Sequence, residues 1–182
     1  MKKLVLLFVV LGSLAAAQSD PAQEALDREQ IIGTIDAIGI YADADRWDLV
    51  ADQFADEVVL DYTSYATASA GAAEPEAITP QEVVTAWQSV LPGYDYTQHI
   101  IGNHQVELNG DEATAVSNVH ATHVLEGEHW IFLGDYEHHL VRTDEGWKVD
   151  QMTANMRAEL GNSDLPDRAT ARVEAGEGRL SQ

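Results

Sequence analysis

The chain has 182 residues, with 10 basic and 31 acidic side chains and a formal net charge of −21 at pH 7. A surface with this much negative charge repels phosphate backbones and anionic lipids. We therefore expect neither nucleic acid nor a membrane surface as a partner. The sequence contains no cysteine, which excludes disulfides, thiol nucleophiles and thiolate metal sites. Its length suits one domain with a sizeable core.

The first 17 residues have the features of a secretory signal peptide. Two lysines precede an apolar run from Leu4 to Leu14, which is short for a bilayer span, and three alanines follow. We expect cleavage after Ala17 and a secreted or periplasmic protein without membrane attachment. The alternative is an uncleaved anchor or a buried first helix. Residues 18–26 are predicted to form a polar leader.

A helical pattern begins near Asp27 and continues to about Asp43. Its apolar stripe is formed by Ile31, Ile35, Ile38 and Ala42, with Ile32 and Gly39 beside it. The helical repeat places Asp43 at the border of this stripe. Residues 45–48 then predict the cap of a short second helix that extends to Phe54.

The rest of the chain is mainly strand and turn. A first strand is predicted at 58–62, then a long loop at 63–79 and a helix at 80–91, which begins with a Thr79 cap. Four strands at 98–108, 113–125, 129–143 and 147–156 follow, separated by turns such as Asn109-Gly110-Asp111. Helices followed by an antiparallel meander define an α+β fold. Residues 161–182 are expected to be an acidic C-terminal tail, either loose or with a short peripheral helix.

Several short motifs, taken together, resemble a known family. They are residues 41–47 (YADADRW), 60–62 (LDY), 97–103 (TQHIIGN), 141–143 (VRT) and 146–147 (GW). Their order and spacing resemble the SnoaL-like branch of the nuclear transport factor 2-like superfamily, of the scytalone dehydratase and ketosteroid isomerase type, over residues 27–160. The resemblance implies a curved antiparallel β-sheet wrapped around a long N-terminal helix. Such a cone-shaped α+β barrel has an apolar pocket at its open end.

The resemblance also implies roles for four residues. Asp43 takes the place of the pocket aspartate and His99 that of its histidine partner. Tyr62 takes the place of a tyrosine that orients a water or a carbonyl oxygen, and His123 aligns with a second pocket histidine. The sequence departs from scytalone dehydratase at three polar positions: a tyrosine is replaced by Ala42, and a serine and an asparagine fall near Gly134 and Tyr136.

The residues themselves support a proton-transfer site. A carboxylate at a helix C-terminus is disfavoured by the helix dipole and needs a compensating partner, which a histidine can provide. An Asp–His pair holds the imidazole in one tautomer and lets it exchange protons near neutral pH. The simpler alternative is that Asp43 is solvated and merely ends the helix. For His123, a core histidine and a pocket group are equally good interpretations, and Tyr62 could be a tyrosine with a wet hydroxyl.

Strand parity bears on the other candidates. Trp130 and Phe132 share a face and are expected to line one wall with Tyr136 as substrate-binding residues. Within the histidine pairs 120/123 and 138/139 the two side chains point to opposite faces. His99 and His104 also do so, unless a bulge at Gly102 restores them to one face. We therefore expect no metal site and no cofactor.

These features favour a secreted, cofactor-independent lyase or isomerase of the dehydratase type that acts on a small apolar molecule. His99 would be the general acid/base, Asp43 its orienting partner, and Tyr62 and His123 polar anchors. The alternative is a non-catalytic carrier or binding protein with the same fold. A homodimer formed through the outer face of the sheet is a further expectation from the resemblance.

Overall fold

The computed structural model describes residues 20–62 and 75–179. The predicted signal peptide and its cleavage site, and most of the predicted loop at 63–79, lie outside the described residues. The elements in chain order are α1 (Pro21–Asp43), α2 (Trp47–Ala51), β1 (Phe54–Asp61), β2 (Ala77–Ile78), α3 (Pro80–Gln88), η2 (Leu91–Gly93), β3 (Tyr96–Asn109), β4 (Glu112–Leu125), β5 (Glu128–Thr143), β6 (Gly146–Gly161) and α4 (Leu165–Glu174).

Helix α1 begins earlier than the sequence pattern indicated. Asp20 caps it by accepting a hydrogen bond from the backbone N–H of Ala22, and Pro21 occupies the first turn. The prediction of a leader over residues 18–26 is therefore wrong for 21–26, which are helical because the cap lies upstream of the apolar stripe. At the other end the helix stops at Asp43, as predicted. No helix in the described ranges is long and apolar enough to span a membrane.

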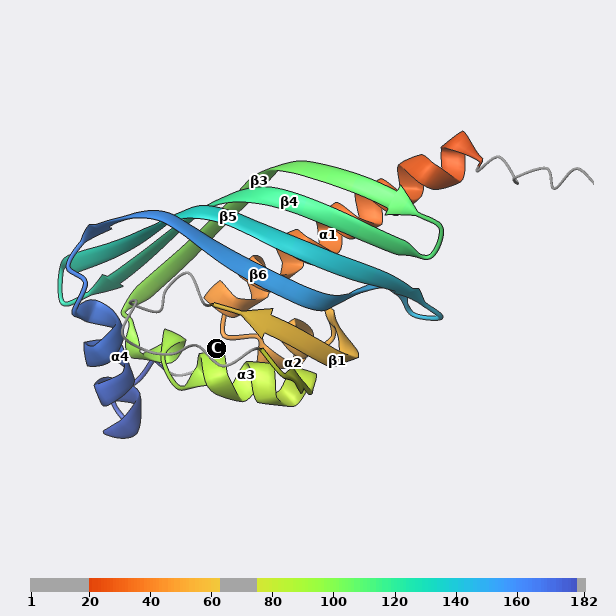
Figure 1. Cartoon of the computed structure of the whole chain (residues 1–182). Helices are drawn as coiled ribbons and strands as arrows, with labels where there is room; N and C mark the ends of the chain where they lie inside the picture. The colour runs from red at the N-terminus through yellow and green to blue at the C-terminus, as the bar shows by residue number, and fades with distance from the viewer. Residues whose placement is uncertain (1–19, 63–74, 180–182) are drawn as a thin grey trace, which may run out of the picture.

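The sheet has six strands in the order β2-β1-β6-β5-β4-β3. The four long strands form the predicted antiparallel meander, and β2 pairs antiparallel with β1. Strand β1 differs from the prediction because it runs parallel to β6, so the sheet is mixed and does not close. Figure 1 shows the long strands arching over α1, with α3 and α4 below the arch.

The core lies between α1 and the concave face of the sheet. Ile31 and Ile35 are fully buried and Ile38 is nearly so, which confirms the predicted stripe. Gly39 continues this face at a close approach to β3, where an added Cβ would lie 3.2 Å from the Cβ of His99. The absence of a side chain at Gly39 therefore lets the end of α1 contact the strand that carries His99.

The C-terminal segment is docked on the domain. Leu165 and Ala169 of α4 are fully buried and form a second apolar cluster with Tyr94 and Leu125. Helix α4 contacts η2 so closely that a Cβ on Gly93 would lie 1.9 Å from the carbonyl oxygen of Ala169. Of the two alternatives for residues 161–182, the short helix is the correct one for Leu165–Glu174.

Candidate functional site

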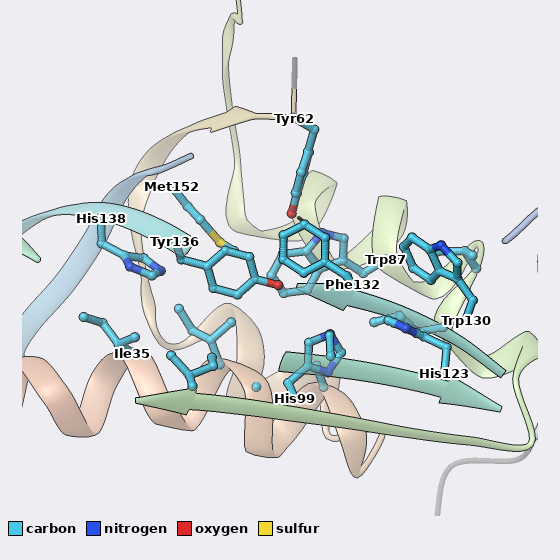
Figure 2. A pocket seen from close by; sticks show the side chains of 17 residues that line it. Ile35, Tyr62, Trp87, His99, His123, Trp130, Phe132, Tyr136, His138 and Met152 are labelled. Atoms are coloured by element: carbon cyan, nitrogen blue, oxygen red, sulfur yellow. Dashed lines mark hydrogen bonds between the residues drawn. The ribbon is translucent and has the colours of Figure 1, made fainter. Parts of the chain in front are cut away.

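A cavity of about 330 Å³ opens inside the arch (Figure 2). Its walls come from α1, α3 and strands β3 to β6, and most of them are apolar or aromatic. The lining residues are Ile35, Ile38, Gly39, Ala42, Tyr62, Trp87, Val90, Leu91, His99, Ile101, Ala121, His123, Trp130, Phe132, Tyr136, His138 and Met152. The size is at the lower end of ligand pockets, which span roughly 300–1,000 Å³, so the cavity suits a small molecule.

Asp43 and His99 are joined by two hydrogen bonds. The Oδ1 atom of Asp43 lies 2.7 Å from Nδ1 of His99, and its Oδ2 atom accepts the backbone N–H of His99, also at 2.7 Å. Asp43 lies behind the ring, outside the cavity lining, whereas His99 lines the cavity. Because Nδ1 is bound to the carboxylate, Nε2 is the ring nitrogen left to act on a ligand.

The environment keeps Asp43 ionised. Burial acts to raise its pKa, but the hydrogen bonds from the ring and backbone of His99, together with the charge of that ring, hold the pKa below its ordinary value. The carboxylate therefore remains an acceptor and fixes His99 as the Nδ1–H tautomer when the ring is neutral. This arrangement is suited to proton transfer at Nε2.

His123 lies next to this pair but in a different environment. Its ring packs between Tyr94 and Trp130, with centroids 4.8 Å from each, and meets the edge of His99 at 5.4 Å. Burial, together with the nearby charge of His99, lowers the pKa of His123 to about 3. A histidine with this pKa is neutral at physiological pH, so it can position a ligand but does not supply a proton.

Tyr62 reaches the cavity from the end of β1. Trp87 of α3 donates its indole N–H to the Tyr62 hydroxyl at 3.1 Å. Burial raises the pKa of Tyr62 to about 12, so the phenol keeps its proton and can donate to a ligand oxygen. The ring of Trp87 itself also lines the cavity.

The predicted aromatic wall lines the cavity. Trp130, Phe132 and Tyr136 all contact it, and the rings of Phe132 and Tyr136 stack at 5.9 Å. Beyond them lies His138, 6.0 Å from Tyr136, and Figure 2 shows it on the opposite side of the cavity from Trp130. Parity alone could not decide which of His138 and His139 points inward. The outward ring is His139, which lies 2.6 Å from Asp150.

The bulge considered at Gly102 is present. The β3–β4 register shifts between Gly102 and Gln105, and Asn103 has a positive φ of 56°. His104 consequently faces the same side as His99, 2.7 Å from Ser117 and 3.1 Å from a carboxylate oxygen of Asp36. The described residues contain no group of three side chains able to hold a metal ion.

The chain belongs to the SnoaL-like domain family, whose sequence model matches residues 23–153. No curated protein sequence matches the chain. Among solved structures, the Kfla4162 protein from Kribbella flavida is 24% identical with a TM-score of 0.71, covering 79% of this chain and 99% of that one.

Two further structures share the fold at lower identity. A hexachlorocyclohexane dehydrochlorinase, LinA-type3 from Novosphingobium barchaimii LL02, is 15% identical with a TM-score of 0.64, covering 79% of this chain and 95% of that one. A protein provisionally described as a scytalone dehydratase, from Novosphingobium aromaticivorans DSM 12444, is 16% identical with a TM-score of 0.62, covering 78% and 91%. At these identities the likeness establishes the nuclear transport factor 2-like cone fold, not the activity.

Proposed function

We propose that this protein is a cofactor-independent lyase or isomerase that moves a proton on a small, neutral, largely apolar molecule. The observation that carries the proposal is the 2.7 Å contact between Asp43 and His99 at the wall of an apolar cavity. The names of two fold relatives, a dehydrochlorinase and a provisional dehydratase, describe eliminations. An elimination of this kind and the proton transfer proposed here both require a base positioned beside a carbon-bound proton.

In this mechanism Nε2 of His99 takes a proton from a carbon of the ligand. Asp43 stabilises the resulting imidazolium through Nδ1–H. Tyr62 donates its phenolic hydrogen to an oxygen on which negative charge develops. The imidazolium then returns its proton either to a departing hydroxide, which leaves as water, or to another carbon of the ligand. The first outcome is a dehydration and the second a double-bond isomerisation.

The lining of the cavity limits the substrate class. Apart from the histidines, its side chains are apolar or aromatic, and the buried His123 and His138 are neutral at pH 7 because burial lowers the pKa of each to about 3. No lysine or arginine is among these lining residues to bind a ligand carboxylate or phosphate. A neutral carbonyl or hydroxy compound suits the site better, since the hydroxyls of Tyr62 and Tyr136 and the ring of His99 can contact its polar atoms.

Two probes test the proposal and separate its two forms. 3-Hydroxycyclohexanone yields 2-cyclohexenone by loss of the C2 proton and the C3 hydroxide, and 3-cyclohexen-1-one yields the same product by moving a C2 proton to C4. The conjugated product is followed by its ultraviolet absorbance. We expect turnover of at least one probe, and a loss of about 10²- to 10⁴-fold in the His99→Ala variant, as for a general acid/base.

The matched control is His120→Ala, which removes an exposed histidine from the outer face of β4. It should retain full turnover. Turnover by the His99→Ala variant at the wild-type rate would refute the assignment. Tight binding of both probes without product, together with an unmodified small molecule that copurifies with the protein, would favour the carrier function instead.

A further inference from the structure

The C-terminal segment returns to the end of α1 after helix α4. The backbone N–H of Arg179 donates to the carbonyl of Pro92 at 2.7 Å, which anchors the segment beside η2. From there the Arg179 side chain reaches Asp45: its Nε lies 2.7 Å from Oδ2 and its Nη2 3.2 Å from Oδ1. The side chain of Arg179 is 19% exposed and that of Asp45 only 7%, so this is a largely buried, two-point ion pair.

The guanidinium also contacts β3. Its Nη2 donates to the hydroxyl oxygen of Thr97 at 3.2 Å, and Thr97 is almost completely buried. Thr97 lies two residues before His99 on β3, and Asp45 lies two residues after Asp43 at the end of α1. Arg179 therefore links the end of α1 to β3, and these are the two segments that carry Asp43 and His99.

The local charges explain why a cation is needed here. Asp43 and Asp45 both lie at the C-terminal end of α1, where the helix dipole disfavours negative charge. Asp45 is buried and has a left-handed φ of 53°, so it cannot easily turn its carboxylate to water. Arg179 balances this charge and leaves the Asp43 carboxylate to His99. It comes from outside residues 23–153, the part of the chain that the family model matches.

We propose that Arg179 is a positioning residue for the site, which holds the Asp43–His99 pair in register through Thr97 and Asp45. The expected effect of Arg179 on turnover rests on the proposed function. Its structural part, the geometry of the Asp43–His99 hydrogen bond, can be measured without any substrate.

The first experiment is NMR of the full chain labelled with ¹⁵N-histidine. The Nδ1–H proton of His99, donated to a carboxylate at 2.7 Å, should resonate far downfield, and its absence in Asp43→Asn assigns it. We expect Arg179→Ala to broaden or shift this signal, and Thr97→Val, which keeps the size of the side chain, to do the same. Guanidinium chloride at millimolar, non-denaturing concentration should restore it in Arg179→Ala but not in Thr97→Val.

The matched control is Arg172→Ala, which breaks another ion pair of the same C-terminal segment, with Asp95 at 2.7 Å, but does not touch Thr97 or Asp43. It should leave the signal unchanged. An unchanged signal in folded Arg179→Ala, or an equal loss in Arg172→Ala, would overturn the proposal, because the tail would then act only on stability.

Turnover of whichever cyclohexenone probe the wild type accepts gives the second readout. Arg179→Ala should lower kcat about 10- to 100-fold, the range expected when a catalytic group is displaced by up to about 1 Å, with little change in KM. Arg179→Ala and Thr97→Val should be non-additive in the double variant, because both break the same contacts. If the wild type turns over neither probe, the proposed function fails while the NMR result still decides the role of Arg179.

Discussion

At the scale of single residues, Asp43 does more than pair with a ring. It accepts both the imidazole N–H and the backbone N–H of His99, so one carboxylate fixes the position and the rotation of the side chain. The pairing of these two residues was predicted from the helix end and the family motif. The hydrogen bond from the backbone N–H of His99 was not predicted. It requires that β3 be an edge strand with an unpaired N–H, which depends on the order of strands in the sheet.

His138 is the residue that sequence reasoning missed most clearly. It is 3% exposed and lines the cavity, and its Nδ1 atom has no hydrogen-bond partner among the described residues. Alternation placed one of His138 and His139 inward, but only the β4–β5 register, which sets His138 opposite Ala115, shows which one. A small residue opposite leaves room for the inward ring.

The buried His138 gives a pH-dependent stability. Burial, with a smaller effect from the charge of His104, lowers its pKa from 6.5 to about 3. The unfolded chain therefore binds the proton more readily, so His138 supports the fold above about pH 6.5 and opposes it as the pH falls toward about 3. Between pH 7 and pH 5 this amounts to about 2 kcal/mol. Between pH 7 and pH 5, the free energy of unfolding should therefore fall by about 2 kcal/mol less in His138→Leu than in the wild type. Urea unfolding at each pH measures this difference.

His139→Leu serves as the comparison for this measurement, since it removes an imidazole from the opposite face of the same strand. If both variants show the same pH dependence as the wild type, the buried ring is not the source of acid sensitivity.

At the scale of elements, the site depends on how closely the end of α1 approaches β3. An added Cβ on Gly39 would lie 3.1 Å from Cδ1 of Ile101 and 3.2 Å from the Cβ of His99, so even an alanine there requires these two side chains to move by a few tenths of an ångström. Gly33, six residues earlier on the same helix, has no atom within 4 Å of its added Cβ. The two glycines offer a matched pair on one helix.

Gly39→Ala should separate activity from stability. Alanine improves helix propensity by about 1 kcal/mol, which offsets part of the strain, so the melting temperature should change little while turnover falls about tenfold or more as His99 shifts. Gly33→Ala should raise stability by about 1 kcal/mol and keep full turnover. Both variants are compared with the wild type by thermal unfolding and by initial rates on the cyclohexenone probes. Undiminished turnover in Gly39→Ala would show that the close approach of α1 to β3 is not required.

The other end of α1 is fixed by an ion pair. Asp27 is 7% exposed at its side chain and accepts two hydrogen bonds from Arg142 of β5, at 2.7 and 2.6 Å, and one from Trp147. Hydrogen bonds from Arg142, only partly opposed by burial, hold the pKa of Asp27 far below its usual value. The stability that it provides is therefore present above about pH 4 and lost as the pH falls further.

Asp27→Asn should destabilise the protein by about 2 kcal/mol at pH 7, since a buried charged hydrogen bond is lost, and should flatten the loss of stability below pH 4. Glu24→Gln on the same helix removes a surface pair with Arg28 at 2.9 Å and should change stability by less than about 0.5 kcal/mol. Chemical denaturation over pH 2–7 tests both. Equal effects of the two variants would contradict a special role for Asp27.

Local sequence signals predicted elements well where the chemistry is local. The Thr79–Glu82 capping box is formed in full, and the turns at Gly110, Gly127 and Gly146 have the positive φ that glycine permits. Features set by distant contacts were not predicted. The parallel pairing of β1 with β6 depends on where the α1–α2 segment returns to the sheet. A short C-terminal helix was one of two alternatives, but the docking of α4 through the buried Leu165 and Ala169 was not predicted.

At the scale of the whole molecule, export remains a prediction from the first 17 residues. We expect the protein recovered from outside the cytoplasm to begin at Gln18, and intact mass spectrometry after expression of the full sequence measures this directly. Replacing Ala15 and Ala17 by bulky residues should retain the longer species. A full-length mass in the exported fraction of the wild type would contradict the prediction.

The open edge of the sheet has one more consequence. Strand β3 is the last in the sheet, and side chains of α1 occupy hydrogen-bonding positions where a neighbouring strand would otherwise pair: Asp43 at the N–H of His99, and Arg28 at the carbonyl of Val106. Unpaired edges recruit strands from other chains. The Asp43 carboxylate thus also blocks pairing of the β3 edge with a strand of another molecule. An Asp43 variant should therefore be examined for self-association by light scattering as well as for its turnover rate.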